Sequence, residues 1–163
     1  MTQVQIGQLV PDFTANIAND KTIQLSDYSG QYVLIYFYPK DNTPGCTQQA
    51  QIFRDSIEQF AALNTVILGV SRDSVKSHDN FKVKHDLPFD LIADTDESLC
   101  QLFDVIKMKN MYGKQVRGIE RSTFLINPEG VLIQAWRKVK VKDHCTELLS
   151  YLNQRSGLPN MEK

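Results

Sequence analysis

One apolar stretch, Tyr32-Val33-Leu34-Ile35-Tyr36-Phe37-Tyr38, decides the fold of this chain. Its residues are continuously apolar and rich in β-branched and aromatic types, which favour a strand that is covered on both faces. Such a strand lies in the middle of a sheet that carries helices on each side. We therefore expect residues 32–38 to form a central strand.

Strand and helix patterns alternate after this stretch. Apolar residues recur at helical spacing over residues 50–63, and this spacing predicts a single amphipathic helix of about four to five turns. Residues 65–70 then predict a second buried strand. A cap at Asp73 or Ser74 favours a helix that runs to about residue 85.

The next elements are shorter. Residues 89–93 predict a strand, and Asp96 can cap a helix whose buried face includes Leu99, Leu102 and Phe103. Residues 122–126 return to a strand pattern.

The end of the chain changes the sheet from parallel to mixed. The turn signal Asn127-Pro128-Glu129-Gly130 joins the strand at 122–126 to residues 131–135, which predicts an antiparallel hairpin. A last helix is expected from a cap at Asp143, and the polar tail at 154–163 is expected to be loose.

This order of elements indicates an α/β fold of the thioredoxin-like kind, a central mixed β-sheet with helices on both faces. The chain has 163 residues, of which 42% are hydrophobic. That length is enough for one core and short for two, so we expect a single domain over residues 1–163. Fold alone does not give function.

Charge and composition exclude several function classes. The formal net charge is -1, which argues against a nucleic-acid partner. The longest apolar run is far below the ~18 residues that a membrane span needs, so no membrane contact is expected. The polar start of the chain lacks a signal-peptide pattern, and we expect a cytoplasmic protein. Three widely spaced cysteines do not form a secreted disulfide framework or a zinc motif.

The loop that follows the central strand places Cys46 at the start of a helix. Thr43 is a good N-cap and Pro44 suits the first helical position, so Cys46 falls in the first turn. The positive end of a helix favours the thiolate over the thiol, and the thiolate is the nucleophile. The alternative is that Cys46 is a small buried apolar residue. The backbone amides of Gly45 and Cys46, with the Thr43 hydroxyl, favour the catalytic interpretation.

The spacing Pro39-x-x-x-Thr43-x-x-Cys46 resembles the peroxidatic signature of the peroxiredoxin family. Further segments are similar to the bacterioferritin-comigratory, or Q-type, branch and extend the resemblance over most of the chain. They are Phe37 to Thr47, Phe53-Arg54-Asp55, Gly69-Val70-Ser71, Leu87-Pro88-Phe89 and Arg121-Ser122-Thr123-Phe124.

The resemblance implies a catalytic role for each of four residues. Cys46 would be the peroxidatic thiolate, and Thr43 would hydrogen-bond the peroxide. Pro39 would shield the thiolate from water, and Arg121 would stabilise the thiolate and the charge that develops on oxygen. Without the resemblance, Arg121 reads as a solvated surface charge.

The resemblance also implies the reaction and its partners. Hydrogen peroxide and alkyl hydroperoxides would oxidise Cys46 to a sulfenic acid. Thioredoxin, glutaredoxin or glutathione would supply the reducing thiol. No metal or organic cofactor is implied, and the Q-type branch implies a monomer. A thiol-based peroxide sensor, or a redox-binding module on the same fold, is the alternative function, because it shares the first chemical step.

The resolving cysteine is where the chain departs from the family. Gln51 and Lys82 occupy the two positions at which Q-type members carry it. Cys100 remains a candidate, although its apolar neighbours favour packing, and Cys145 lies on the apolar stripe of the last helix. We therefore expect recycling by an external thiol.

Two other features have plain interpretations. His78, His85 and His144 are scattered without a metal-ligand spacing, so surface or capping roles are expected. The basic stretch 107–114 contains two methionines, and we expect a solvated loop, with a docking loop for a reductase or a second subunit as the alternative.

Overall fold

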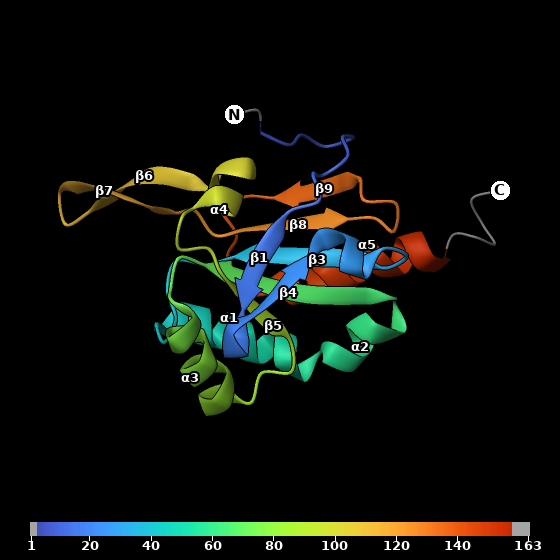
Figure 1. Cartoon of the computed structure of the whole chain (residues 1–163), viewed down its shortest axis with the longest axis horizontal. Coiled ribbons are helices and arrows are strands. Elements are labelled where there is room, and N and C mark those ends of the chain that lie inside the picture. The colour runs from blue at the N-terminus through green and yellow to red at the C-terminus, as the bar shows by residue number, and fades with distance from the viewer. Residues whose placement is uncertain (1–2, 158–163) are drawn as a thin grey trace.

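A computed structural model describes residues 3–157, and a five-stranded sheet forms its centre (Figure 1). The strand order is β5-β4-β3-β8-β9, with β3 (Tyr32–Phe37) in the middle as predicted. β4 (Thr65–Ser71) is parallel to β3, and β5 (Asp90–Ala93) is parallel to β4. β8 (Ser122–Ile126) is antiparallel to β3 and pairs with β9 (Leu132–Trp136) in the expected hairpin.

The side chains of β3 divide the core into two halves. Val33, Ile35 and Phe37 belong to one apolar cluster, and Leu34 and Tyr36 belong to the other. This division follows from the alternation of side chains between the two faces of a strand. Both faces are therefore buried, and the apolar run that the sequence shows is explained.

Five helices lie within the described residues 3–157. They are α1 (Pro44–Asp55), α2 (Ile57–Ala62), α3 (Val75–His85), α4 (Ser98–Leu102) and α5 (His144–Gly157). Buried residues of α1, α2, α3 and α5 belong to the same cluster as Leu34 and Tyr36, whereas those of α4 belong to the other cluster. The sheet thus separates α4 from the other four helices.

The single helix expected up to residue 63 is wrong, because the chain breaks at Ser56. Ser56 has a φ of -107° and a ψ of 7°, and its amide donates to the carbonyl of Phe53 at 3.1 Å. The apolar spacing continues through the break because α2 packs Phe60 into the same core. Periodicity alone therefore does not reveal two helices.

The solvated loop expected at 107–114 is also wrong. β6 (Ile106–Met111) and β7 (Lys114–Ile119) form an antiparallel hairpin that projects from the body of the molecule (Figure 1). Tyr112 and Gly113, with φ values of 52° and 79°, make its turn. Ile106-Lys107-Met108-Lys109 alternates apolar and basic residues, which is a strand pattern that the loop interpretation overlooked.

The two ends of the chain add smaller corrections. β1 (Thr14–Ile17) and β2 (Lys21–Gln24) form a second antiparallel pair, with short 3-10 helices at Ala18–Asp20 and Leu25–Tyr28. α5 continues through Gln154 to Gly157, so the expected loose tail begins too early, and its remainder lies outside the described residues. None of the helices in residues 3–157 is long and apolar enough to cross a membrane.

Candidate active site

The loop between β3 and α1 places a cysteine at a helix N-terminus, as the sequence predicts. Thr43 is the N-cap with extended backbone angles, and Pro44 is the first helical residue. Cys46 is the third residue of α1, and its side chain is only 2% exposed. Pro39 is half-buried at the start of the same loop. The sulfur therefore lies beside the free amides of the first helical turn, where negative charge is stabilised.

Arg121 reaches this sulfur from a distant part of the sequence. It immediately precedes β8, whose Ser122 pairs with Phe37 at the carboxyl end of β3. The Nη2 atom of Arg121 donates to Cys46 Sγ at 3.4 Å. The structure places Arg121 beside the sulfur, which is the location that the resemblance implies, because strand pairing brings it to the loop that holds the cysteine.

Gln49 is a site residue that the sequence analysis missed. It is 3% exposed, and its Oε1 accepts a hydrogen bond of 2.6 Å from Nη1 of Arg121. Gln49 follows Cys46 by three positions, which places both side chains on one face of α1. That spacing is the signal that could have found it. Gln49 thus binds Nη1 of the Arg121 guanidinium, while Nη2 faces the sulfur of Cys46.

Gly45 makes room for this arginine. A Cβ atom built on Gly45 would lie 3.3 Å from Nη2 of Arg121, closer than side chains normally approach. Tyr36 lies in the same core cluster as Cys46, and its buried hydroxyl has no partner in the described part of the chain. Burial, followed by the charge of Cys46, raises the pKa of Tyr36 well above its ordinary value. Tyr36 therefore keeps its proton next to the thiol.

Thr43 is positioned as predicted, but its hydroxyl has a local partner. It donates to the carbonyl oxygen of Lys40 at 2.9 Å, and it makes no capping bond to the helix. Within residues 3–157, no hydrogen bond joins Thr43 to Cys46. The structure thus brings Cys46 and Arg121 into direct contact, while Thr43 and Pro39 share the loop that leads to them.

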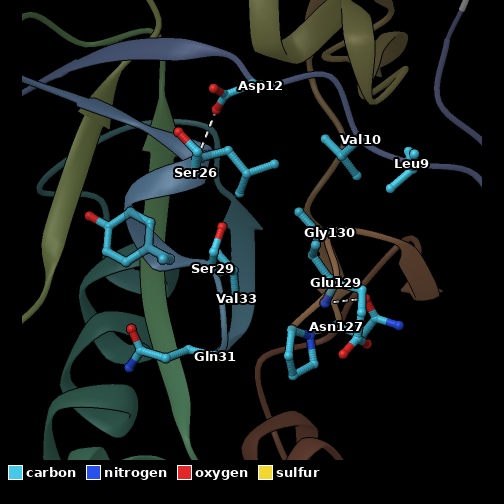
Figure 2. Close-up of a pocket in the computed structure, with 14 residues that line it drawn as sticks. Leu9, Val10, Asp12, Ser26, Ser29, Gln31, Val33, Asn127, Glu129 and Gly130 are labelled. Atoms are coloured by element: carbon cyan, nitrogen blue, oxygen red, sulfur yellow. Dashed lines mark hydrogen bonds between the residues drawn. The ribbon is translucent and has the colours of Figure 1, made fainter.

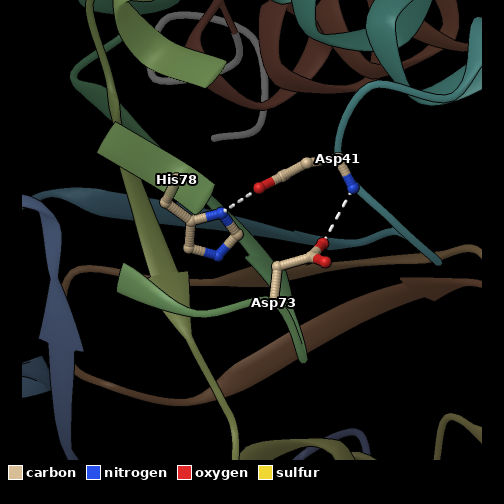
Figure 3. Close-up of side chains that lie close together, drawn as sticks. All are labelled: Asp41, Asp73 and His78. Carbon is tan, nitrogen blue, oxygen red and sulfur yellow. Dashed lines mark hydrogen bonds and ion pairs between the residues drawn. The ribbon is translucent and has the colours of Figure 1, made fainter. Parts of the chain in front are cut away.

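A buried polar network anchors this loop to α3 (Figure 3). Asp41 accepts hydrogen bonds from the Tyr38 hydroxyl at 2.6 Å and from the Ser77 hydroxyl at 2.7 Å. Its carboxylate also lies 2.7 Å from Nδ1 of His78, and the Asp41 amide donates to Asp73 at 2.8 Å. The loop just before Cys46 is therefore held by Tyr38, which directly follows β3, by two side chains of α3, and by Asp73 between β4 and α3.

The structure corrects the interpretation of two histidines, His78 in this network and His144 outside it. His78 is fully buried, and its Nε2 lies 2.9 Å from the carbonyl of Ile92. His144 is 5% exposed and lies 2.9 Å from the Thr123 hydroxyl. Surface or capping roles are wrong for both, because each ring is part of a buried contact. Ligand atoms of Asp41, Asp73 and His78 lie within 4.8 Å of one another, and the hydrogen bonds above explain their proximity.

The two other cysteines are buried, as expected. Cys100 belongs to the core cluster on the opposite side of the sheet from Cys46, and burial raises its pKa above the ordinary value. Cys145 shares the cluster of Cys46, and its sulfur lies 3.5 Å from the Ser56 hydroxyl. Burial raises the pKa of Cys145 as well. Both remain in the less reactive thiol form.

The two positions at which Q-type members carry a resolving cysteine make polar contacts with other elements here. Gln51 on α1 lies 3.3 Å from Nδ1 of His85 on α3. Lys82 on α3 forms an ion pair of 3.3 Å with Asp90. These positions carry polar contacts between elements, and neither supplies a thiol.

One cavity lies far from this site. It has a volume of about 170 Å³ and is lined by residues such as Asp12, Ser29 and Asn127 (Figure 2). Val33 at the amino end of β3 also lines it, whereas Cys46 follows the carboxyl end of that strand. The cavity is therefore at the opposite end of the sheet from the reactive sulfur.

Comparison with known proteins decides the family. Residues 6–135 match the model of the AhpC/TSA family. Peroxiredoxin Bcp of Bacillus subtilis is 54% identical over 153 residues, which cover 94% of this chain and 98% of that protein. This chain is a peroxiredoxin of the AhpC/TSA family. The predicted resemblance to the bacterioferritin-comigratory, or Q-type, branch is thereby confirmed, and so is the predicted class of enzyme, a thiol-dependent peroxidase.

Solved structures of related proteins have the same fold as this peroxiredoxin. The bacterioferritin comigratory protein of Xanthomonas campestris, described for its alkyl peroxide reduction activity, is 49% identical, with a TM-score of 0.86. The match covers 91% of this chain and 97% of that one. The PrxQ of Xylella fastidiosa is 44% identical with a TM-score of 0.90, over 96% and 99% of the two chains. The predicted thioredoxin-like fold is confirmed.

Proposed function

We propose that Cys46 reduces hydrogen peroxide and small alkyl hydroperoxides. The observation that carries this assignment is the contact of 3.4 Å between Arg121 Nη2 and the sulfur at the start of α1. A guanidinium and helix amides together stabilise a thiolate and the negative charge that develops on the oxygen that leaves. The alkyl peroxide activity described for the Xanthomonas relative supports the substrate class.

The first half-reaction oxidises the sulfur by two electrons. The thiolate attacks one peroxide oxygen, so that an S–O bond forms while the O–O bond breaks. The second oxygen takes up a proton and leaves as water or an alcohol, and Cys46 becomes a sulfenic acid. Arg121 and the amides near Gly45 stabilise the charge during this displacement. Thr43 and Pro39 complete the site by orienting the peroxide and excluding water.

An external thiol restores the enzyme. It attacks the sulfenic sulfur, releases water and forms a mixed disulfide, and a second thiol then regenerates Cys46 and leaves as a disulfide. Three observations support an external donor: Gln51 and Lys82 lack thiols, and Cys100 lies across the sheet from Cys46. Thioredoxin, glutaredoxin or glutathione supplies the thiol to a monomeric, cytoplasmic enzyme.

Intact mass after one equivalent of hydrogen peroxide, with and without dimedone, tests this function. We expect a dimedone adduct on Cys46 and no adduct in Cys46→Ser. A loss of about two hydrogens that disappears in Cys100→Ser would instead make Cys100 the resolving residue and would refute recycling by an outside thiol. Peroxide consumption that persists in Cys46→Ser would refute the assignment of the nucleophile.

A further inference from the structure

Lys109 of β6 is a half-buried cation without a carboxylate partner. None of the ion pairs in the described residues 3–157 includes it. The neighbouring cations are different, since Arg117 pairs with Glu97 and Lys107 pairs with Asp104. A charge that is taken partly out of water without a partner is unfavourable. Such an unpaired positive charge can attract an anionic group.

The Lys109 side chain runs along the hairpin toward the active site. Lys109 pairs with Val116, but its Cε and Nζ atoms lie 3.8 and 3.9 Å from the place where Gly118 would carry a Cβ atom. The side chain of Lys109 therefore crosses diagonally over Gly118, the residue three positions before Arg121. The absence of a side chain at Gly118 gives this path its room.

The charges that act on Lys109 include two from the active site, together with those of Glu120 and Arg72. Burial lowers the pKa of Lys109, and so does the nearby positive charge of Arg121, whereas Cys46 and Glu120 act in the opposite direction. Arg121 itself is held by neutral Gln49 and by the sulfur. Arg121 thus contacts Cys46 directly, and the Lys109 side chain lies over Gly118 on the strand that leads to Arg121.

The same face of the hairpin offers an approach to this charge. Cross-strand partners share a face, so Lys109 shares one with Met111, Val116 and Lys114. Met111 is 48% exposed and Val116 is 40% exposed. This face is basic and apolar, and it leads from the tip of the hairpin to Arg121.

We propose that Lys109 makes the Cys46 site selective for carboxylate-bearing reactants over neutral ones. The proposal rests on the peroxidase function above and specifies its substrate class. The carboxylate can belong to an alkyl hydroperoxide or to the thiol that reduces the sulfenic acid. In both cases Lys109 attracts the carboxylate while the reacting oxygen or sulfur approaches Cys46.

Alkylation of reduced Cys46 measures this selectivity without any peroxide. The thiolate displaces iodide from anionic iodoacetate or from neutral iodoacetamide, and the ratio of the two rates reports the charge at the site. The measurement uses the Cys100→Ser/Cys145→Ser background, in which Cys46 is the only cysteine that can be alkylated. We expect Lys109→Gln to lower the ratio by about three- to tenfold, as the loss of one nearby charge predicts.

Matched variants separate charge from structure. Lys114→Gln removes the same charge from the exposed tip of the same face, and we expect it to leave the ratio unchanged. Lys109→Arg keeps the charge and should keep the ratio. In the protein with Lys109 intact, raising the salt concentration to 0.5 M should shrink the ratio toward that of Lys109→Gln.

Pairs of a free acid and its methyl ester then identify which reactant carries the carboxylate that Lys109 attracts. One arm compares the hydroperoxide of linoleic acid with that of its methyl ester, and the other compares 3-mercaptopropionate with its methyl ester as the reducing thiol. A fall in preference for the free acid in Lys109→Gln assigns the carboxylate to the arm in which it occurs. An unchanged alkylation ratio, an equal fall for both alkylating reagents, or no change in either arm overturns the proposal. A different result would refute the proposed function and leave the charge selectivity standing. In that result the unsubstituted protein consumes no peroxide, although the ratio of iodoacetate to iodoacetamide rates behaves as expected.

Discussion

Replacement of Asp41 by alanine tests how strongly the active-site loop is anchored. The Asp41→Ala change removes the acceptor for the Tyr38 hydroxyl, the Ser77 hydroxyl and Nδ1 of His78. The Ser77 side chain is half-buried and can turn toward water, whereas Tyr38 and His78 are buried. Two buried polar groups without partners cost about 1 to 3 kcal/mol each, so we expect a loss of about 4 kcal/mol.

Asp41→Asn is the matched control. The amide oxygen can still accept from Tyr38, and its NH₂ group can donate to a His78 ring that carries its proton on Nε2. That proton still reaches the Ile92 carbonyl. We expect this variant to lose about 1 to 2 kcal/mol, because one charge-assisted contact becomes neutral.

Urea titration of both variants supplies the measurement. A loss of about 4 kcal/mol is a large fraction of the ~5 to 15 kcal/mol that holds a domain together, and it should lower the Tm by about 8 to 16 °C. Asp41→Ala should also alkylate faster at Cys46, because the loop before it is released. Equal stabilities of the two variants, or a loss below about 1 kcal/mol in Asp41→Ala, would refute the reasoning.

The same carboxylate predicts a pH dependence. Burial by itself raises the pKa of Asp41, but the hydrogen bonds from His78, Tyr38 and Ser77 outweigh it and hold the pKa below 3.8. A group with a lowered pKa in the folded state contributes stability above its ordinary pKa and loses it as the pH falls. The stability difference between the unsubstituted protein and Asp41→Ala should therefore shrink below about pH 4.

Four further substitutions test the site and the two other cysteines. Arg121→Ala removes the guanidinium next to the sulfur, and we expect kcat/KM for peroxide to fall by about 100-fold or more in stopped-flow assays; a fall of less than about threefold would contradict its role. Gly45→Ala places a methyl group against Arg121, so activity should fall several-fold while the melting temperature changes little, and an unchanged rate would show that the arginine has room to move. Cys100→Ser and Cys145→Ser should leave steady-state turnover with an external thiol nearly unchanged, and a large loss in a variant that is still folded would reveal a redox role for that cysteine.

The sequence was sufficient for the centre of the fold and for the cysteine. The run at 32–38 is apolar on both faces, which leaves few arrangements other than a central strand. Thr43 and Pro44 define where a helix begins, and this placed Cys46 in its first turn. Both inferences depend on local chemistry, which a single sequence displays directly.

Features that depend on contacts between distant residues were not predicted. Asp41 and His78 are 37 positions apart, and no local pattern connects them. Gln49 looks like an exposed helical residue in the sequence, and only the structure shows that Arg121, just before β8, donates a hydrogen bond to it. The hairpin at 106–119 was missed because its strands carry lysines where a buried strand would carry apolar side chains.

The helix break at Ser56 has a consequence for the lifetime of the oxidised enzyme. A sulfenic acid on Cys46 is buried, so a bulky thiol donor reaches it only when part of α1 opens. Because α1 ends at Asp55, such an opening need not extend into α2. The break therefore limits the length of chain that must melt in each catalytic cycle, and it keeps the cost of exposing the sulfur well below that of unfolding the whole protein.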